Sequence, residues 1–467
     1  MGRCLHYVEQ PELITKANMS ADSLSRRSFL KQASLALPLS AAVPTALAAA
    51  PRSEAKAPAG SGYFGRGTRL AISMWDFSWL HASHPGGVYA DLERRVAEAA
   101  ERGYNTLRVD CFPSRIVEPE SRFEKNWDPS VNVPQWGQRA ASFTCNVRKK
   151  VAELAELCRK HQLWLGLDSW DKPHMFGHDR VIEAAEEERE FTRYGEIWVK
   201  ALKLMREDGV LERAVWIAPM NEVPHFAGGH VAALRKAGEA TRHEGETQLT
   251  KAQNVDAIYR RINGWMAAPI RVEVAPEKIL LSYSSLGAED YGARLTDDYD
   301  VVDVHFMPGV ICDAEDRKAF PGVPFGITRF PGGNVPVFAG QQLATEPQKY
   351  EVAAFSRAWD SACRRHYAAM LKRTRNYHQT ALAHLTLPSG QKLAAIITES
   401  FGPCVWPDDP AVSWEWYKRY NADSLRIIAA MDFKGSSLSN YAEPLFSLWR
   451  DVDWHWTGNT YFLAGKG

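Results

Sequence analysis

The chain has 467 residues, and its 56 Lys and Arg balance its 56 Asp and Glu, so that the formal net charge is zero. This balance excludes the basic excess with which proteins bind nucleic acid or an anionic membrane surface. Apolar residues make up 45% of the chain, which is enough for one large hydrophobic core or two ordinary ones.

The first fifty residues have the pattern of an export signal. Residues 25–31 contain the twin arginine Arg26-Arg27 of a Tat signal, an Ala/Leu-rich segment follows at 33–42, and Ala46-Leu47-Ala48 is a small-x-small cleavage site. We therefore predict a Tat signal peptide and leader over residues 1–48 and a linker over 49–66. The Tat translocase is then a partner, and the mature protein is expected to be periplasmic or secreted. A basic N-terminus without structure is the alternative.

The sequence also bears on where translation starts and on whether the chain enters a membrane. Residues before Met19 fit no part of a Tat signal, so Met19 competes with Met1 as the start. No other stretch approaches the roughly 20 apolar residues of a membrane helix, so we expect no stable membrane insertion.

From residue 67 onward, short apolar runs alternate with stretches of helical periodicity. After the first run, Leu92, Val96 and Ala99 recur at helical spacing, and Gly103 is placed to end that helix. Six of the runs are predicted as strands at 69–75, 105–111, 163–168, 279–283, 301–306 and 437–441. Further helices are predicted around 151–158, 197–205, 252–266, 348–383 and 425–431. No regular helix is expected after the last strand.

Two further runs end in a glutamate. The apolar run from Ala214 ends at Asn221-Glu222, and the run from Leu393 ends at Glu399. Both are too short for a helix and lack alternation, as is typical of strands that are covered on both faces of a parallel sheet. The two runs complete a set of eight strand-and-helix units.

Eight such units in one chain predict an α/β protein with a (β/α)8 TIM barrel, as a single domain over residues 67–467. The alternative is a doubly wound open sheet. No glycine-rich phosphate turn follows the first strand, which speaks against it.

In a barrel the carboxyl ends of all strands face one mouth, where the chemistry of these folds lies. The polar residues expected there are Asp76, Arg108, Asp110, Asp168, Asn221, Glu222, His305 and Glu399. Two facing carboxylates with Trp around them suit cleavage of a glycosidic bond, in which one carboxylic acid protonates the leaving oxygen and the other carboxylate attacks the anomeric carbon. An adjacent Arg favours the charged form of the nucleophile.

These residues resemble those of the clan A glycoside hydrolases, and most closely the cellulase family, family 5, with its cellulase-like relatives. Residues 103–108 are similar to that family's second strand, whose arginine, here Arg108, supports the nucleophile. The resemblance implies that Glu222 is the acid/base, that Asn221 holds the sugar 2-hydroxyl and that Glu399 is the nucleophile.

The chain departs from the family at two places. His305 resembles the first member of a His-x-Tyr pair, but Met307 stands at the tyrosine position. Tyr283 is a candidate replacement for that hydroxyl. The Trp75-Asp76 end of the first strand also differs from the usual family opening.

Other candidate binding residues are less specific. Asp76, Asp110 and Asp168 are expected either to bind sugar hydroxyls or to pin loops. The indoles of Trp75, Trp170 and Trp406 are candidate sugar platforms, with a place in the core as the alternative for each. The Pro- and Gly-rich connection from Met307 to Val337 is predicted to shape the substrate cleft.

We predict neither a cofactor nor a catalytic metal. His174 and His178 lie near Asp168 and Asp171 in sequence, but loop histidines without an organised ligand set are not a metal site. None of the seven cysteines is in a C-x-x-C pair, which excludes the common zinc and redox motifs. One or two disulfides remain open.

The sequence therefore predicts a retaining β-glycoside hydrolase that acts on a carbohydrate substrate. A catalytically silent carbohydrate-binding barrel is the second hypothesis, although binding alone does not need both carboxylates. A barrel lyase or esterase is the third, and no G-x-S-x-G elbow supports it.

Overall fold

A computed structural model describes residues 68–118, 120–123, 142–171, 182–183, 185–223, 236, 251–275, 279–285, 287, 290–321, 323, 352–402 and 408–465. The predicted signal peptide, Trp406, His174 and His178 lie outside these residues, as do residues 322 and 324–337 of the connection that follows Met307.

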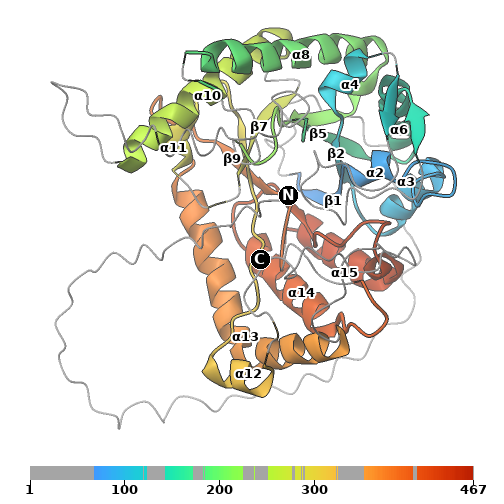
Figure 1. The fold of residues 1–467 in the computed structure, drawn as a ribbon, viewed down its shortest axis with the longest axis vertical. Helices are drawn as coiled ribbons and strands as arrows, with labels where there is room; N and C mark the ends of the chain where they lie inside the picture. Colours follow the sequence, from blue (N-terminus) through green and yellow to red (C-terminus); the bar gives the residue numbers. More distant parts are fainter. Residues whose placement is uncertain are drawn as a thin grey trace, which may run out of the picture. The chain divides into compact units, whose positions relative to one another are not determined.

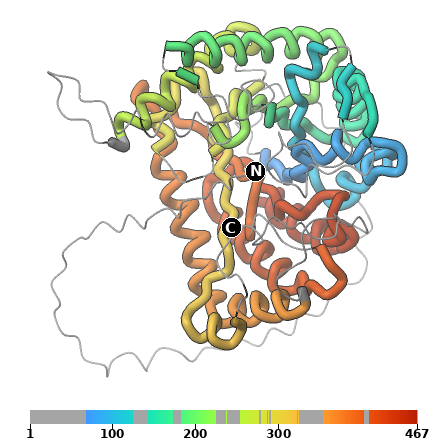
Figure 2. The backbone as a smooth tube through the Cα atoms, viewed as in Figure 1, coloured from blue at the N-terminus to red at the C-terminus, as the bar shows by residue number. Residues whose placement is uncertain are grey.

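Eight parallel strands form a closed barrel in the order β1, β10, β9, β8, β7, β6, β5, β2, and β2 pairs again with β1. Their bounds are β1 Leu70–Asp76, β2 Thr106–Asp110, β5 Trp164–Asp168, β6 Ala214–Ile217, β7 Leu280–Ser285, β8 Val301–Val304, β9 Ala394–Ile397 and β10 Gly435–Ser437. The predicted (β/α)8 barrel is thereby confirmed. Figure 2 shows the closure by colour, with the blue start of the barrel beside its red C-terminal part.

Helices alternate with these strands along the chain and lie around the strands in Figure 1. The longer helices are α3 Leu92–Glu101, α6 Val147–Lys160, α8 Glu187–Glu207, α10 Lys251–Glu273, α13 Val352–Ala383, α14 Glu415–Ala429 and α15 Val452–Leu463. The shorter ones are α2 Ser78–His81, α4 Pro113–Val117, α11 Tyr291–Arg294, α12 Ala314–Ala319, η1 Val210–Glu212 and η2 Ser447–Arg450. No helix in the described ranges combines the length and the apolar character that crossing a membrane requires.

Local sequence explains where several helices begin and end. Asp91 accepts a hydrogen bond from the Arg94 N–H at the start of α3, and Asn146 accepts one from the Lys149 N–H at the start of α6. Gly103, which follows α3, has a φ of +78°, a conformation that glycine adopts without steric cost.

The barrel interior depends on one glycine. A small core cluster that includes Ile72, Trp216, Leu280 and Ile396 comes from the barrel strands and their immediate ends. A Cβ on Gly166 would lie 1.9 Å from Cζ2 of Trp216, so the indole fills the space that a side chain at position 166 would need. The Trp216 side chain on β6 therefore occupies the space in the barrel interior that Gly166 on β5 leaves open.

The structure corrects two expectations about the fold and adds one feature. The eighth strand lies at Gly435–Ser437, before most of the predicted 437–441, and its pairing of Leu70 with Gly435 fixes this register. A regular helix, α15, does follow it. The loop after β2 also contains a small antiparallel pair, β3 Ser121–Phe123 and β4 Phe143–Cys145, which the sequence did not reveal.

The cysteines of the described ranges form no disulfide with one another. All five of them are free thiols: Cys111, Cys145, Cys158, Cys312 and Cys363. Cys4 and Cys404 lie outside these ranges.

Candidate active site

Arg108 stands at the centre of the barrel mouth on β2 and is fully buried. Its Nε lies 2.7 Å from Oδ2 of Asp168 and its Nη1 lies 2.7 Å from Oε1 of Glu399. Oδ1 of Asp76 is 3.5 Å from the same Nη1. Burial by itself lowers the pKa of Arg108, but these carboxylates raise that pKa well above its usual value. The guanidinium is therefore a fixed positive charge shared among three acids.

Glu399 follows β9 and is 6% exposed. One of its oxygens, Oε1, accepts hydrogen bonds from Arg108 Nη1 at 2.7 Å and from Asn221 Nδ2 at 3.1 Å. Both donors are themselves buried and held by other groups, so the orientation of this carboxylate is fixed before any ligand binds.

Asn221 and Glu222 follow β6, where the backbone turns sharply. Glu222 has a φ of +49°, which a residue with a side chain adopts only when its surroundings impose it. Ser284 on β7 is one such constraint, because its Oγ accepts the Glu222 N–H at 3.1 Å and donates to Asn221 Oδ1 at 2.5 Å. Ser284 therefore orients both residues of the Asn-Glu pair.

His305 links the two glutamates. Its Nδ1 lies 2.9 Å from Glu222 Oε1 and 3.6 Å from Glu399 Oε1, and its Nε2 lies 3.2 Å from Asp303 Oδ2. Burial lowers the pKa of His305, but Glu399 and Asp303, with a hydrogen bond to Glu222, raise that pKa well above its usual value. These carboxylates favour the protonated ring, which can donate from both nitrogens.

Asp303 completes this arrangement from inside β8. Burial alone would raise the pKa of Asp303, but His305, with Arg108 and Thr398, lowers it below its usual value. Thr398 donates to Asp303 from both its backbone N–H, at 2.8 Å, and its hydroxyl, at 2.5 Å. Asp303 is thus an ionised partner that keeps the positive charge on His305.

The carboxylate oxygens of Glu222 and Glu399 and a ring nitrogen of His305 all lie within 4.8 Å of one another. Three such groups can in principle hold a metal ion. To bind a metal, His305 would have to give up a proton, whereas Glu222 and Asp303 beside its two ring nitrogens favour the protonated ring.

A second acidic group with a histidine lies between α12 and α13. Asp313, Asp316 and His366 could also surround a cation, but Arg365 already forms ion pairs with both aspartates. Asp313 and Asp316 form the capping box of α12, so this group ties α12 to α13. α12 lies within the predicted cleft-shaping connection.

The three further acids mainly hold the protein itself. Asp110 accepts the N–H groups of Phe112 at 2.7 Å and of Trp170 at 2.8 Å, which pins two loops. Asp168 is fully buried against Arg108. Asp76, which is 4% exposed and has a φ of +45°, accepts a hydrogen bond from the Trp170 indole at 2.7 Å.

Three aromatic candidates, Tyr283, Trp75 and Trp170, do not lie where their expected roles require. The ring of Tyr283 packs edge-on against Tyr291 and Tyr299 in the layer between strands and helices, whereas its neighbour Ser284 contacts Asn221. It cannot replace the hydroxyl missing at Met307, because successive side chains of a strand point to opposite faces. Trp75 is fully buried against Tyr89, and Trp170 is 4% exposed and holds Asp76.

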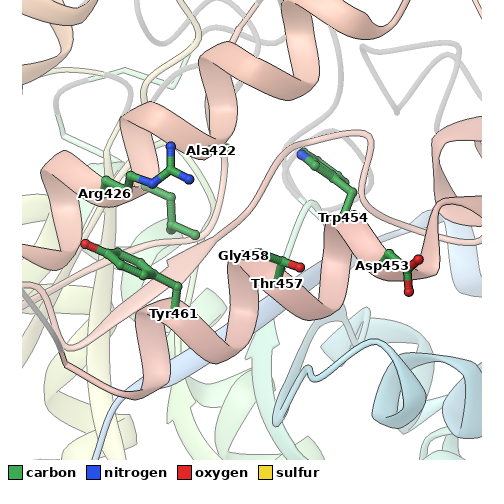
Figure 3. Close-up of a pocket in the computed structure, with 8 residues that line it drawn as sticks. Ala422, Arg426, Asp453, Trp454, Thr457, Gly458 and Tyr461 are labelled. Carbon is green, nitrogen blue, oxygen red and sulfur yellow. The ribbon is translucent and has the colours of Figure 1, made fainter. Parts of the chain in front are cut away.

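A groove elsewhere on the molecule holds none of the predicted site residues. It has a volume of about 330 Å³, and its walls come from α14 and α15. Figure 3 shows Arg426 and Tyr461 toward one end and Trp454 and Asp453 toward the other.

Sequence reasoning missed Ser284, Asp303 and Thr398. The one available signal was a polar residue inside an otherwise apolar strand, as with Asp303 in Val301–Val304. A buried polar side chain requires partners, but the sequence does not say which.

The family described as sugar-binding cellulase-like matches residues 72–330, which make up more than half of the chain. The match spans Arg108, Asn221, Glu222 and His305, and it ends before Glu399. No curated protein has a sequence that matches this chain.

Among solved structures, a protein from Parabacteroides distasonis, whose assignment as a glycoside hydrolase is inferred, is 20% identical to this chain and has a TM-score of 0.61. The likeness covers 85% of this chain and 94% of that one, and it shows the same fold. A family 5 xyloglucan-specific β-1,4-glucanase from a ruminal metagenomic library is 12% identical over 80% of this chain and 87% of its own, with a TM-score of 0.41. A family 5 glycoside hydrolase of Prevotella bryantii is 10% identical over 79% of this chain and 86% of its own, with a TM-score of 0.38.

Proposed function

The chain belongs to the sugar-binding cellulase-like family, and we propose that it is a retaining β-glycoside hydrolase. The observation that carries the proposal is the separation of the two glutamates. One carboxylate oxygen of Glu222 and one of Glu399 lie within 4.8 Å of each other. Retaining enzymes place their carboxyl groups about 5–5.5 Å apart, whereas inverting enzymes leave about 6.5–9.5 Å for a water molecule.

In this proposal Glu399 is the nucleophile. Arg108 and Asn221 hold its Oε1, so the carboxylate is already oriented when the anomeric carbon arrives. The carboxylate attacks that carbon and forms a glycosyl-enzyme, while the bond to the leaving oxygen breaks.

Glu222 is the acid/base of the same reaction. It gives a proton to the leaving oxygen in the first step and takes one from the attacking water in the second. The contact from His305 Nδ1 at 2.9 Å stabilises its carboxylate form between the two steps. Asp76 also lies beside Arg108 and, unlike Asp168, is not completely buried, so we assign it to accept a hydrogen bond from a sugar hydroxyl.

One observation favours the second candidate, a carbohydrate-binding barrel without catalysis. His305 Nδ1 lies 2.9 Å from Oε1 of Glu222, and a protonated ring there would favour the Glu222 carboxylate, which cannot protonate a leaving group. Turnover of substrates with poor leaving groups is the property that separates the two candidates.

The test is hydrolysis of a panel of aryl β-glycosides and β-linked oligosaccharides, with the first-formed anomer identified by NMR. A β-anomeric product supports the proposal, and an α-anomeric product refutes retention. Glu399→Gln is expected to abolish turnover, while Glu188→Gln, an exposed glutamate on α8, is the matched control. Binding of oligosaccharides without any turnover supports the silent barrel.

We also propose that the enzyme acts in the periplasm or outside the cell. The basis is the twin arginine Arg26-Arg27 and its flanking residues in the sequence.

A further inference from the structure

One peptide group connects the two halves of the active site. The carbonyl oxygen of His305 accepts a hydrogen bond of 2.7 Å from the Tyr377 hydroxyl on α13. The N–H of the same peptide, on Phe306, donates to the Glu399 carbonyl oxygen at 3.0 Å. The peptide is therefore held from one side by a helix and from the other side by the end of β9.

Packing reinforces the position of this peptide. The rings of Tyr377 and Phe306 have centroids 4.4 Å apart, and the His378 ring lies edge-on to Phe306 at 5.0 Å. Burial lowers the pKa of His378 to about 4, so this neighbour brings no charge near neutral pH. Tyr377 is thus the polar contact in an otherwise apolar clamp on residues 305 and 306.

The side chain that this clamp positions faces charged groups from several elements. Glu222 after β6, Asp303 on β8 and Glu399 after β9 are the charged groups closest to the His305 ring. Ser284 and Thr398 are its hydroxyl neighbours. Each of these contacts depends on where the backbone at residue 305 lies.

We propose that Tyr377 is a positioning residue, whose hydroxyl fixes the peptide between His305 and Phe306 and so aligns His305 with Glu222. The proposal rests on the proposed function for its kinetic consequence and on geometry alone for its structural consequence. Without the hydroxyl, the peptide can rotate about its remaining bond to Glu399, and His305 loses its fixed distance to Glu222.

The matched pair of variants is Tyr377→Phe and Tyr367→Phe. Both tyrosines lie on α13 and each donates one hydroxyl hydrogen bond, but Tyr367 donates to Asp423 on α14, at 2.6 Å. Tyr377→Phe is expected to lower kcat on an aryl β-glycoside about tenfold with little change in KM, because misalignment affects proton transfer rather than ground-state binding. Tyr367→Phe is expected to leave kcat unchanged.

The pH profile gives a readout that a merely structural role does not move. Loosening the contacts that raise the pKa of His305 weakens its hold on the proton. The alkaline limb of kcat/KM, which reports on the Glu222–His305 pair, is therefore expected at lower pH in Tyr377→Phe. An unmoved limb together with an unchanged kcat would overturn the proposal.

A second measurement does not depend on catalysis. In protein with labelled histidine, the His305 signal is assigned by its loss in His305→Gln and is then titrated in the parent and both tyrosine variants. A lower midpoint in Tyr377→Phe alone supports the positioning role, even if no glycoside is hydrolysed and the proposed function fails. Identical midpoints in all three proteins refute it.

Discussion

Arg108 and Glu399 are 291 positions apart in the sequence, yet Nη1 of the arginine lies 2.7 Å from Oε1 of the glutamate. This contact joins β2 to the end of β9 across the mouth of the barrel. It makes the proposed nucleophile part of a buried charge network that also contains Asp168 and Asp76.

We expect Arg108→Met to be strongly destabilising and inactive. The substitution leaves Asp168 and Glu399 without their buried counter-charge, and removing one partner of such a network costs about 3–5 kcal/mol. Denaturant unfolding measures this loss. Arg148→Met, at an exposed ion pair with Asp208, is the control and should cost about 0–1 kcal/mol. Equal losses in the two variants would contradict the network.

Azide is expected to separate the roles of the two glutamates. In Glu399→Ala the anion fills the space of the lost nucleophile and attacks the anomeric carbon directly, which gives the α-glycosyl azide. In Glu222→Ala the glycosyl-enzyme still forms from substrates with good leaving groups, and azide then gives the β-glycosyl azide with faster turnover. Product NMR distinguishes the two. The opposite pairing would reverse the assignment.

His305 should make stability depend on pH. Its pKa is raised in the folded state, so its contribution is fully present below its unfolded pKa of about 6.5 and is lost as the pH rises through the higher folded pKa. The stability gap between the parent and His305→Gln should therefore be wide at about pH 6 and narrow toward alkaline pH. Urea unfolding at several pH values measures the gap.

The control for this prediction is His366→Gln, which removes a partly exposed histidine from the buried Asp316, a carboxylate that keeps its ion pair with Arg365. We expect a gap of about 0–1 kcal/mol for it. A gap for His305→Gln that widened with rising pH would show that the ring is neutral in the folded protein.

Gly166→Ala should disrupt the barrel interior. The added Cβ would lie 1.9 Å from the Trp216 indole, and overpacking of this kind typically costs about 1–3 kcal/mol or more. Trp216→Phe in the same chain should restore part of the loss, since a smaller ring vacates the position. Gly264→Ala, whose added Cβ would meet only a Thr296 methyl at 3.1 Å, is the control. Additive losses in the Gly166→Ala and Trp216→Phe double variant would argue against direct contact.

Export is expected to depend on the twin arginine. Replacing both Arg26 and Arg27 by lysine should leave an uncleaved precursor in the cytoplasm, because the Tat machinery recognises the arginine pair. Cell fractionation with immunoblotting follows the protein. Normal periplasmic accumulation of this variant would rule out the Tat assignment.

The sequence by itself determined the barrel and the strand ends that carry its chemistry. Apolar runs of strand length that alternate with helical periodicity leave few other architectures, and the glutamates after β6 and β9 stand out against apolar neighbours. The eighth strand was misplaced because Gly435–Ser437 has no apolar side chain to mark it.

Only the tertiary structure decided which polar groups meet. Thr398 contacts Asp303, from which it is separated by 95 positions in the sequence, and Ser284 contacts Asn221, from which it is separated by 63. These contacts depend on how neighbouring strands are aligned in the barrel. The same alignment turns Ser284 toward the site and Tyr283 away from it, since a shift of one residue reverses every side chain on a strand. Composition and spacing do not encode that register, which is set when all eight strands close around Trp216 and its neighbours.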